Sequence, residues 1–105
     1  MNLLNKYIPD YSGHIQHYKY CSKRQTIEIV FFDRPEDFQP VLKLVFNNVI
    51  ELSYEQLEPT EDDYIELVIG LDVTNEVYCL HTDIREVTFS ATNLTSYDLT
   101  NAIAY

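Results

Sequence analysis

Hydrophobic and polar residues alternate with a period of two through most of the chain between residues 13 and 90. In residues 25–32 the alternation places Ile27, Ile29 and Phe31 on one face, and residues 41–46 repeat it. Successive side chains of a β-strand point to opposite faces of the sheet, so this period predicts strands with one face in a core.

Seven such segments are separated by turn signals. They span residues 14–21, 25–32, 41–46, 49–54, 64–72, 76–81 and 85–90. Asn47 and Asn48 tolerate the left-handed backbone of a tight turn, and residues 33–40, with two prolines, indicate a longer loop. No helical segment is long enough for a parallel crossover, so we expect the strands to pair antiparallel.

The expected fold is therefore mainly β, with about seven short strands in an antiparallel β-sandwich or a partly open barrel. The length of 105 residues fits a single domain, residues 1–105. Short helical segments are expected only at the termini and near residues 54–58, where Ser53 can serve as an N-cap and Pro59 would end the helix.

One strand allows a specific prediction about its two faces. Residues 64–72 have the clearest alternation, and Ile65, Leu67, Ile69 and Leu71 are expected to face the core. A glutamate between these positions then points away from the hydrophobic face and is expected to be exposed.

The charge of the chain is strongly uneven. Seventeen acidic residues against seven basic ones give a formal net charge of −10. Residues 1–52 are neutral, with six residues of each sign, whereas residues 53–105 hold eleven acidic residues and Arg85 alone. Affinity for phosphate backbones comes mostly from Lys and Arg, so the charge argues against a nucleic-acid partner and indicates either a basic partner or simply solubility.

The densest acidic stretch lies next to tyrosines. Tyrosine offers a large amphipathic surface at low entropic cost, and carboxylates around it suit a basic partner. The alternative that the tyrosines only cover the edges of a small sheet stays open. The residues expected to form a partner-binding surface are Tyr54, Glu55, Glu58, Glu61, Asp62, Asp63, Tyr64 and Glu66.

Motifs for catalysis and metal binding are missing from the sequence. There is no Gly-x-Ser-x-Gly elbow, no Walker phosphate loop and no dinucleotide fingerprint, which favours a non-enzymatic protein without a cofactor. Cys79 and His81 share one strand face, but no further ligand follows at a familiar zinc spacing. The acidic runs near Asp33 and Glu61 lack the alternate ligand spacing of an EF-hand loop.

The cellular setting is inferred from the start of the chain and from the cysteines. Residues 1–10 lack the sustained apolar stretch of a signal peptide, and no run approaches the roughly 18 apolar residues of a membrane span. A cytoplasmic protein without membrane association is expected, with Cys21 and Cys79 as reduced thiols.

The order of elements resembles small bacterial β-rich families of unknown function, some of which are grouped with immunity proteins of polymorphic-toxin systems. The resemblance covers about two-thirds of the chain. It is carried by residues 11–15, 26–30 and 87–91, and by residues 44–52 with their Phe-Asn-Asn-Val segment. Where these families often carry a His-Asp pair, this chain has Ser12-Gly13-His14, so no catalytic residue carries over.

The sequence favours one functional class and leaves two others open. The leading hypothesis is a protein-binding domain, in its narrower form an immunity-like inhibitor whose carboxylates occupy the charged surface that a basic toxin offers its substrate. The first alternative is a structural module whose strand edges pair with copies of itself, giving a homo-oligomer. The second is a barrel with a small-molecule or metal site near Cys79 and His81.

Overall fold

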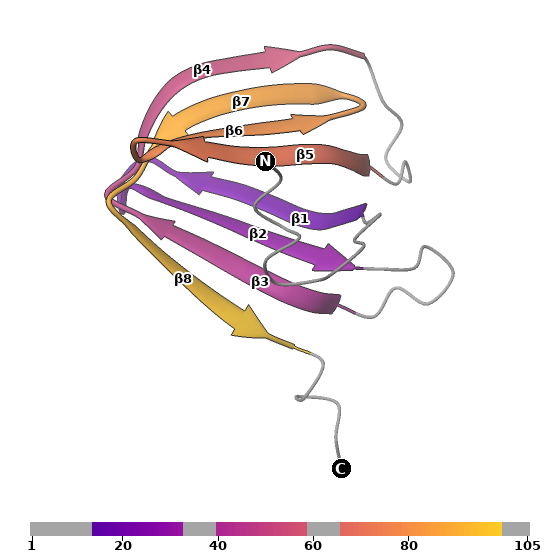
Figure 1. Cartoon of the computed structure of the whole chain (residues 1–105), viewed down its shortest axis with the longest axis horizontal. Coiled ribbons are helices and arrows are strands. Elements are labelled where there is room, and N and C mark those ends of the chain that lie inside the picture. Colours follow the sequence, from indigo (N-terminus) through magenta and orange to yellow (C-terminus); the bar gives the residue numbers. More distant parts are fainter. Residues whose placement is uncertain (1–13, 33–39, 59–65, 100–105) are drawn as a thin grey trace.

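A computed structural model describes residues 14–32, 40–58 and 66–99 of the chain. These residues form eight β-strands, and no helix occurs among them (Figure 1). The strands are β1 (His14–Cys21), β2 (Thr26–Phe32), β3 (Pro40–Asn47), β4 (Ile50–Gln56), β5 (Glu66–Thr74), β6 (Val77–Thr82), β7 (Arg85–Ser90) and β8 (Asn93–Asp98). The described residues therefore contain no helix that could cross a membrane.

The eight strands belong to one antiparallel sheet in the order β4-β7-β6-β5-β1-β2-β3-β8. The joint between β5 and β1 is short, because it consists of the residue pairs His14 with Leu67 and Ile15 with Glu66. This joint divides the sheet into two halves, β1-β2-β3-β8 and β4-β7-β6-β5. Figure 1 shows the edge strands β4 and β8 far apart on opposite sides of the molecule. Among the described residues the sheet is not closed into a barrel.

The predicted antiparallel β fold is confirmed, and the strand count is eight instead of about seven. The additional strand, β8, begins at Asn93 and pairs with β3 along its whole length. Residues 96–98 of the irregular C-terminal segment therefore extend the sheet, whereas the helices expected at the two termini fall outside the described residues. β8 is largely exposed, and Leu94 is its residue that packs against the core, which explains the weak hydrophobic alternation of this segment.

The helical segment predicted near residues 54–58 is wrong. β4 continues through Gln56 and pairs with β7, with Tyr54 opposite Val87 and Gln56 opposite Arg85. Beyond the strand, the N–H of Leu57 donates to the carbonyl of Ile84 at 2.8 Å. The backbone groups that a helical turn would satisfy internally are bound by β7 instead, so tertiary pairing overrides the local capping signal.

The faces predicted for β5 are wrong at two of the positions that the structure describes. Leu67 and Ile69 are 40% and 58% exposed, whereas Val68 and Leu71 are buried. The register against β6 shifts between Val68 and Gly70, which marks a β-bulge. A bulge inserts one extra residue into the alternation. The residues before it therefore point to the face opposite to the one that strict alternation, counted back from Leu71, would give them. Ile65 lies outside the described residues.

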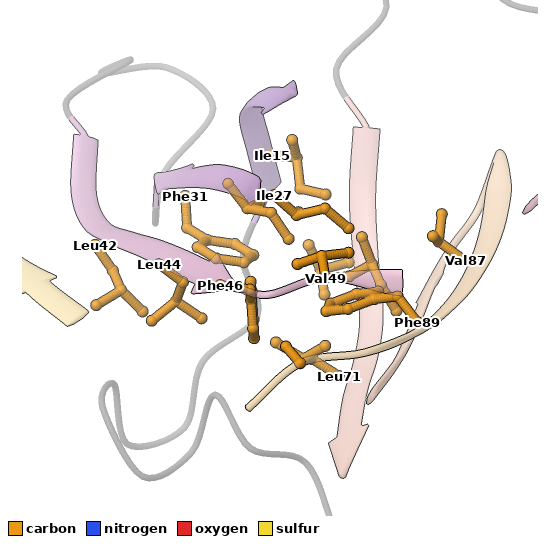
Figure 2. Close-up of a cluster of buried hydrophobic side chains, with 14 residues drawn as sticks. Ile15, Ile27, Phe31, Leu42, Leu44, Phe46, Val49, Leu71, Val87 and Phe89 are labelled. Carbon is orange, nitrogen blue, oxygen red and sulfur yellow. The ribbon is translucent and has the colours of Figure 1, made fainter. Parts of the chain in front are cut away.

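The hydrophobic core fills the space between the two halves of the sheet. Figure 2 shows side chains from β2 and β3 meeting side chains from β5 and β7 in one cluster. At its centre the ring of Phe46 stands edge-on to the rings of Phe89 and Tyr78, with both centroid distances 4.9 Å. Phe46 and Phe89 are completely buried. Aromatic packing across the two halves therefore holds the sheet folded over on itself.

Four connections between strands meet at one end of the molecule, at the left in Figure 1. Hydrogen bonds join them in pairs: the N–H of Val49 donates to Gln25 at 2.8 Å, and the N–H of Ala91 donates to Glu76 at 3.1 Å. Gln25 and Glu76 adopt positive φ angles of 54° and 66°, the backbone of tight turns. A third bond runs from Thr92 to the carbonyl of Asn47 at 3.2 Å, so this end ties the two halves together.

Replacing Phe46 should reveal how much stability the central packing supplies. Phe46→Ala removes a buried ring and leaves a cavity against Phe89 and Tyr78, so the free energy of unfolding should fall by about 3–5 kcal/mol. Urea titration followed by circular dichroism measures this change. Val45→Ala, on the outer face of the same strand, is the control and should cost about 1 kcal/mol or less. Equal losses in the two variants would show that the core is not centred on Phe46.

Candidate functional site

The charge asymmetry of the sequence becomes a difference between the two halves of the sheet. In the β4-β7-β6-β5 half, residues 50–58 and 66–90 hold eight acidic residues and Arg85, a net charge of −7. In the other half, residues 14–32, 40–49 and 91–99 hold four basic and two acidic residues, a net charge of +2. The candidate site is therefore the outer surface of the acidic half, which includes the edge strand β4.

Three of the predicted site residues lie on or next to β4. Tyr54, Glu55 and Glu58 are exposed, within a run of six consecutive exposed residues from Ser53 to Glu58. The hydroxyl of Tyr54 donates to the side-chain oxygen of Gln56 at 3.4 Å. Glu61, Asp62, Asp63 and Tyr64 lie outside the described residues.

Two glutamates face each other across β4 and β7. Glu55 is the direct partner of Glu86 in the register of these strands, so both side chains lie on the same, outer face of the sheet. Like charges in this position are destabilising. Glu86 also contacts His81 on β6, whose Nδ1 lies 3.2 Å from Glu86 Oε2. Two like charges therefore meet on the outer face of the acidic half.

Glu66, the eighth predicted residue, lies apart from this surface. It is 6% exposed, and its Oε2 accepts a 2.6 Å hydrogen bond from the hydroxyl of Thr82. Arg85 Nε lies 2.8 Å from the same oxygen, but its N–H direction does not satisfy hydrogen-bond geometry. The contact is thus an electrostatic pair. The bulge in β5 turns Glu66 inward, which the simple alternation did not anticipate.

Arg85 links the buried residues Glu66 and Thr82 to neighbouring strands. Its guanidinium lies 5.0 Å from the ring centroid of Tyr18 on β1 and 6.0 Å from that of Tyr54 on β4. Both distances suit cation–π attraction. The only basic residue of the second half of the sequence is therefore bound by Glu66 and two tyrosines, and does little to neutralise the acidic surface. Sequence reasoning counted Arg85 but gave it no role, although its isolation among acidic residues was a signal.

Thr82 orders the short connection between β6 and β7. Its hydroxyl oxygen accepts hydrogen bonds from the backbone N–H groups of Ile84 at 3.2 Å and Arg85 at 3.1 Å, while its proton goes to Glu66. Asp83 adds a second link, since its carboxylate accepts from the N–H of Leu67 at 3.1 Å. These bonds satisfy polar groups around a fully buried threonine, as burial requires.

The other half of the sheet gathers the basic residues on its outer face. Glu28 on β2 lies 2.7 Å from Lys43 Nζ and 3.5 Å from His17 Nε2. The hydrogen bond from Lys43, with the positive charges around it, lowers the pKa of Glu28 despite some desolvation. A hollow of about 450 Å³ opens beside this group. It is lined by Lys19, Cys21, Arg24, Thr26, Glu28 and Val45.

The Cys79 and His81 pair has a different environment from the one a metal needs. Both lie on the outer face of β6, where Cys79 Sγ is 3.9 Å from the hydroxyl of Thr88 and His81 contacts Glu86. Within the part of the chain that the structure describes, no three His, Cys, Asp or Glu side chains are grouped to hold a metal ion. Both cysteines are free thiols.

Comparison of the chain with protein-family models, with curated proteins and with solved structures found no match. The resemblance to immunity-protein families therefore stays a prediction.

The buried ion pair predicts a large effect from a single substitution. Glu66→Ala leaves Arg85 without its carboxylate and removes the shorter of the two acceptors of the Thr82 hydroxyl, so the free energy of unfolding should fall by about 3 kcal/mol. This value is at the low end for broken buried pairs, because the side chain of Arg85 is 20% exposed. Urea unfolding measures the loss, and Glu55→Ala, an exposed carboxylate of the same half, should change stability by about 0.5 kcal/mol or less.

The Glu28 contact predicts a pH-dependent contribution to stability. The pKa of Glu28 in the folded chain lies below the value of 4.5 expected without these contacts. The contact therefore stabilises the fold fully above pH 4.5, and the stabilisation is lost as the pH falls through the lower pKa of the folded state. Lys43→Met should therefore cost about 0.2–1 kcal/mol at neutral pH, and the cost should vanish in acid.

Unfolding curves of wild type and Lys43→Met over a pH series measure this difference. Lys19→Met is the matched control, because Lys19 acts on Glu28 only through a weaker charge effect, and its cost should be smaller. A cost for Lys43→Met that is independent of pH would contradict the ion-pair account.

Proposed function

We propose that this protein is a non-enzymatic binding domain that takes a basic protein partner on the acidic half of its sheet. The observation that carries the proposal is Glu55 facing Glu86 across β4 and β7 in a half with a net charge of −7. A lysine or arginine of the partner placed between these carboxylates relieves their repulsion. The folded protein is therefore more stable in the complex than alone.

Apolar side chains next to the carboxylates support a protein partner over a simple counterion. Ile50, Tyr54 and Leu57 are 58%, 43% and 39% exposed on the same edge of the sheet. Aromatic and aliphatic groups contribute desolvated contact area at an interface, while the carboxylates around them set orientation and speed of encounter. Exposed apolar groups give nothing to the binding of small cations.

In its narrower form the proposal is an immunity-like inhibitor of a basic toxin. That form rests on the resemblance of the sequence pattern to families grouped with immunity proteins, together with the acidic surface. Carboxylates on a rigid sheet imitate the regular negative charge of a nucleic-acid backbone, and they would compete for the basic surface with which a nuclease binds its substrate.

Self-association is the second candidate, and the two edges of the sheet favour it. β4 and β8 each pair with one neighbour among the described strands, so each leaves one row of backbone groups for another chain. Joining β4 of one copy to β8 of the next would give an open-ended assembly, because such a contact is not self-complementary.

Neutralising exposed carboxylates of β4 tests the proposed function. Glu55→Gln with Glu58→Gln should weaken binding of a lysine-rich protein by roughly threefold to tenfold at low salt, because exposed ion pairs contribute about 0.2–1 kcal/mol each. The dependence of affinity on salt should flatten as well. Calorimetric titration with histone H1, as a basic probe protein, over a series of salt concentrations measures both effects.

The matched control changes a carboxylate on the other edge strand. Asp98→Asn lies on β8, in the half with net positive charge, and should leave both affinity and salt dependence near the wild-type values. Equal losses from the β4 and β8 variants would show that the probe responds to total charge, and would overturn the assignment of the site to the acidic half.

A further inference from the structure

The free edge of β4 has backbone groups ready to pair with another strand. Leu57 N donates to Ile84 O, which fixes the hydrogen-bonded positions of the β4 and β7 ladder. In an antiparallel pair these positions alternate with positions whose N–H and C=O point away from the neighbour. Counting back from Leu57, the backbone groups of Gln56 and Tyr54 point to the free edge, on the side away from β7.

We propose that the partner binds by strand addition: an extended basic segment of another protein pairs with β4 as a ninth strand. This inference rests on the proposed function and names the way in which the acidic half takes its partner. Main-chain hydrogen bonds to Tyr54 and Gln56 supply sequence-independent affinity, as in other peptides that extend a sheet. Side chains on the two faces of the added strand then supply specificity.

The two faces of β4 define which segment fits. On the outer face, the residue opposite Glu55 lies close to both Glu55 and Glu86, where a lysine or arginine completes the charge pairing. On the inner face, Tyr54 offers an exposed ring next to Arg85, which suits an apolar neighbour and disfavours a second cation. The fitting segment therefore alternates basic and apolar residues.

Charge decides between the two kinds of chain that could occupy the edge. A second copy joined through β4 would bring Glu55, Glu86 and Glu58 of both copies together in halves that each carry −7. A basic segment meets the same residues with attraction. No lysine that would repel a basic segment and no proline that would remove a backbone donor occurs between Ile50 and Glu58, and the bulge of β4 lies between Glu51 and Ser53, before the pairing positions Tyr54 and Gln56.

The experiment uses the full chain and a nine-residue peptide in which lysine alternates with valine. The reference is the same peptide methylated on alternate backbone nitrogens, which keeps every side chain and charge but cannot form the ladder. Amide hydrogen exchange by NMR should show at least tenfold slower exchange at Tyr54 and Gln56 when the unmethylated peptide is bound. The methylated peptide should bind at least tenfold more weakly in calorimetric titration.

A pair of proline variants gives a second, independent readout. Gln56→Pro removes a free-edge N–H and leaves the net charge unchanged, so it should weaken the peptide at least tenfold. Ser96→Pro is the matched control on the other edge, since Leu99 N donates to Val41 O and the same alternation turns Ser96 outward from β3. It should bind the peptide within about twofold of wild type. Circular dichroism of each variant confirms that it is folded.

The outcomes separate the mode of binding from the function. If both peptides bind equally and the Glu55→Gln and Glu58→Gln variant weakens both, strand addition is wrong while the acidic half still binds basic partners. If neither peptide binds at millimolar concentration and the basic probe protein also fails to bind, both proposals are wrong. If Tyr54 and Gln56 amides gain protection with rising protein concentration and no peptide, a second copy occupies the edge and the basic occupant is wrong.

Discussion

Packing between the inner faces of two half-sheets is the interaction on which the structure depends. The backbone joint between the halves comprises two residue pairs, so hydrogen bonding along the sheet cannot fix their relative position. The rings of Phe46, Phe89 and Tyr78 do so at the centre, and the bonded turns around Val49 and Ala91 do so at one end. Since apolar burial is the main favourable term of folding, most inner positions hold apolar side chains.

This constraint determines where charge is tolerated. The inner face admits the ion pair of Glu66 with Arg85, which lies next to Thr82 and the rings of Tyr18 and Tyr54. The contacts of Glu28 with His17 and Lys43, and that of Glu86 with His81, lie on outer faces, where water weakens them. The outer faces of the halves are therefore free to differ in charge without cost to the core. The fold does not depend on the difference in net charge between the two halves, −7 against +2, because this charge lies mainly on the outer surfaces.

The sequence was informative wherever side-chain period alone decides the structure. The alternation in residues 25–32 and 41–46 predicted β2 and β3 with their buried faces, because both are central strands with one clear apolar face. It failed at β5 and β4 for separate reasons. The bulge near Ile69 changes the period beside Gly70, and a glycine inside a strand is a bulge signal that alternation alone does not use. The pairing of β4 with β7 outweighs the capping signal at Ser53.

The candidate site divides in the same way. Local sequence placed Tyr54, Glu55 and Glu58 in an acidic surface, and the structure describes them as exposed. It could not place Glu86 opposite Glu55, because that contact depends on the register between strands 31 residues apart in the chain. It also assigned Glu66 to the surface. An inward glutamate could be predicted only if Arg85 and Thr82 were known to lie beside it.

Edge strands must avoid pairing with copies of their own chain, and natural proteins often place lysine there. β4 uses glutamates instead, in the half of the sheet that holds all of the acidic excess of the described residues. Glutamate protects equally well against an identical edge, because both copies carry the same sign. It differs in what it admits: a lysine-protected edge would accept acidic segments, whereas this edge accepts basic ones. The charges that keep the protein from assembling through β4 are thus the same charges that select its partner.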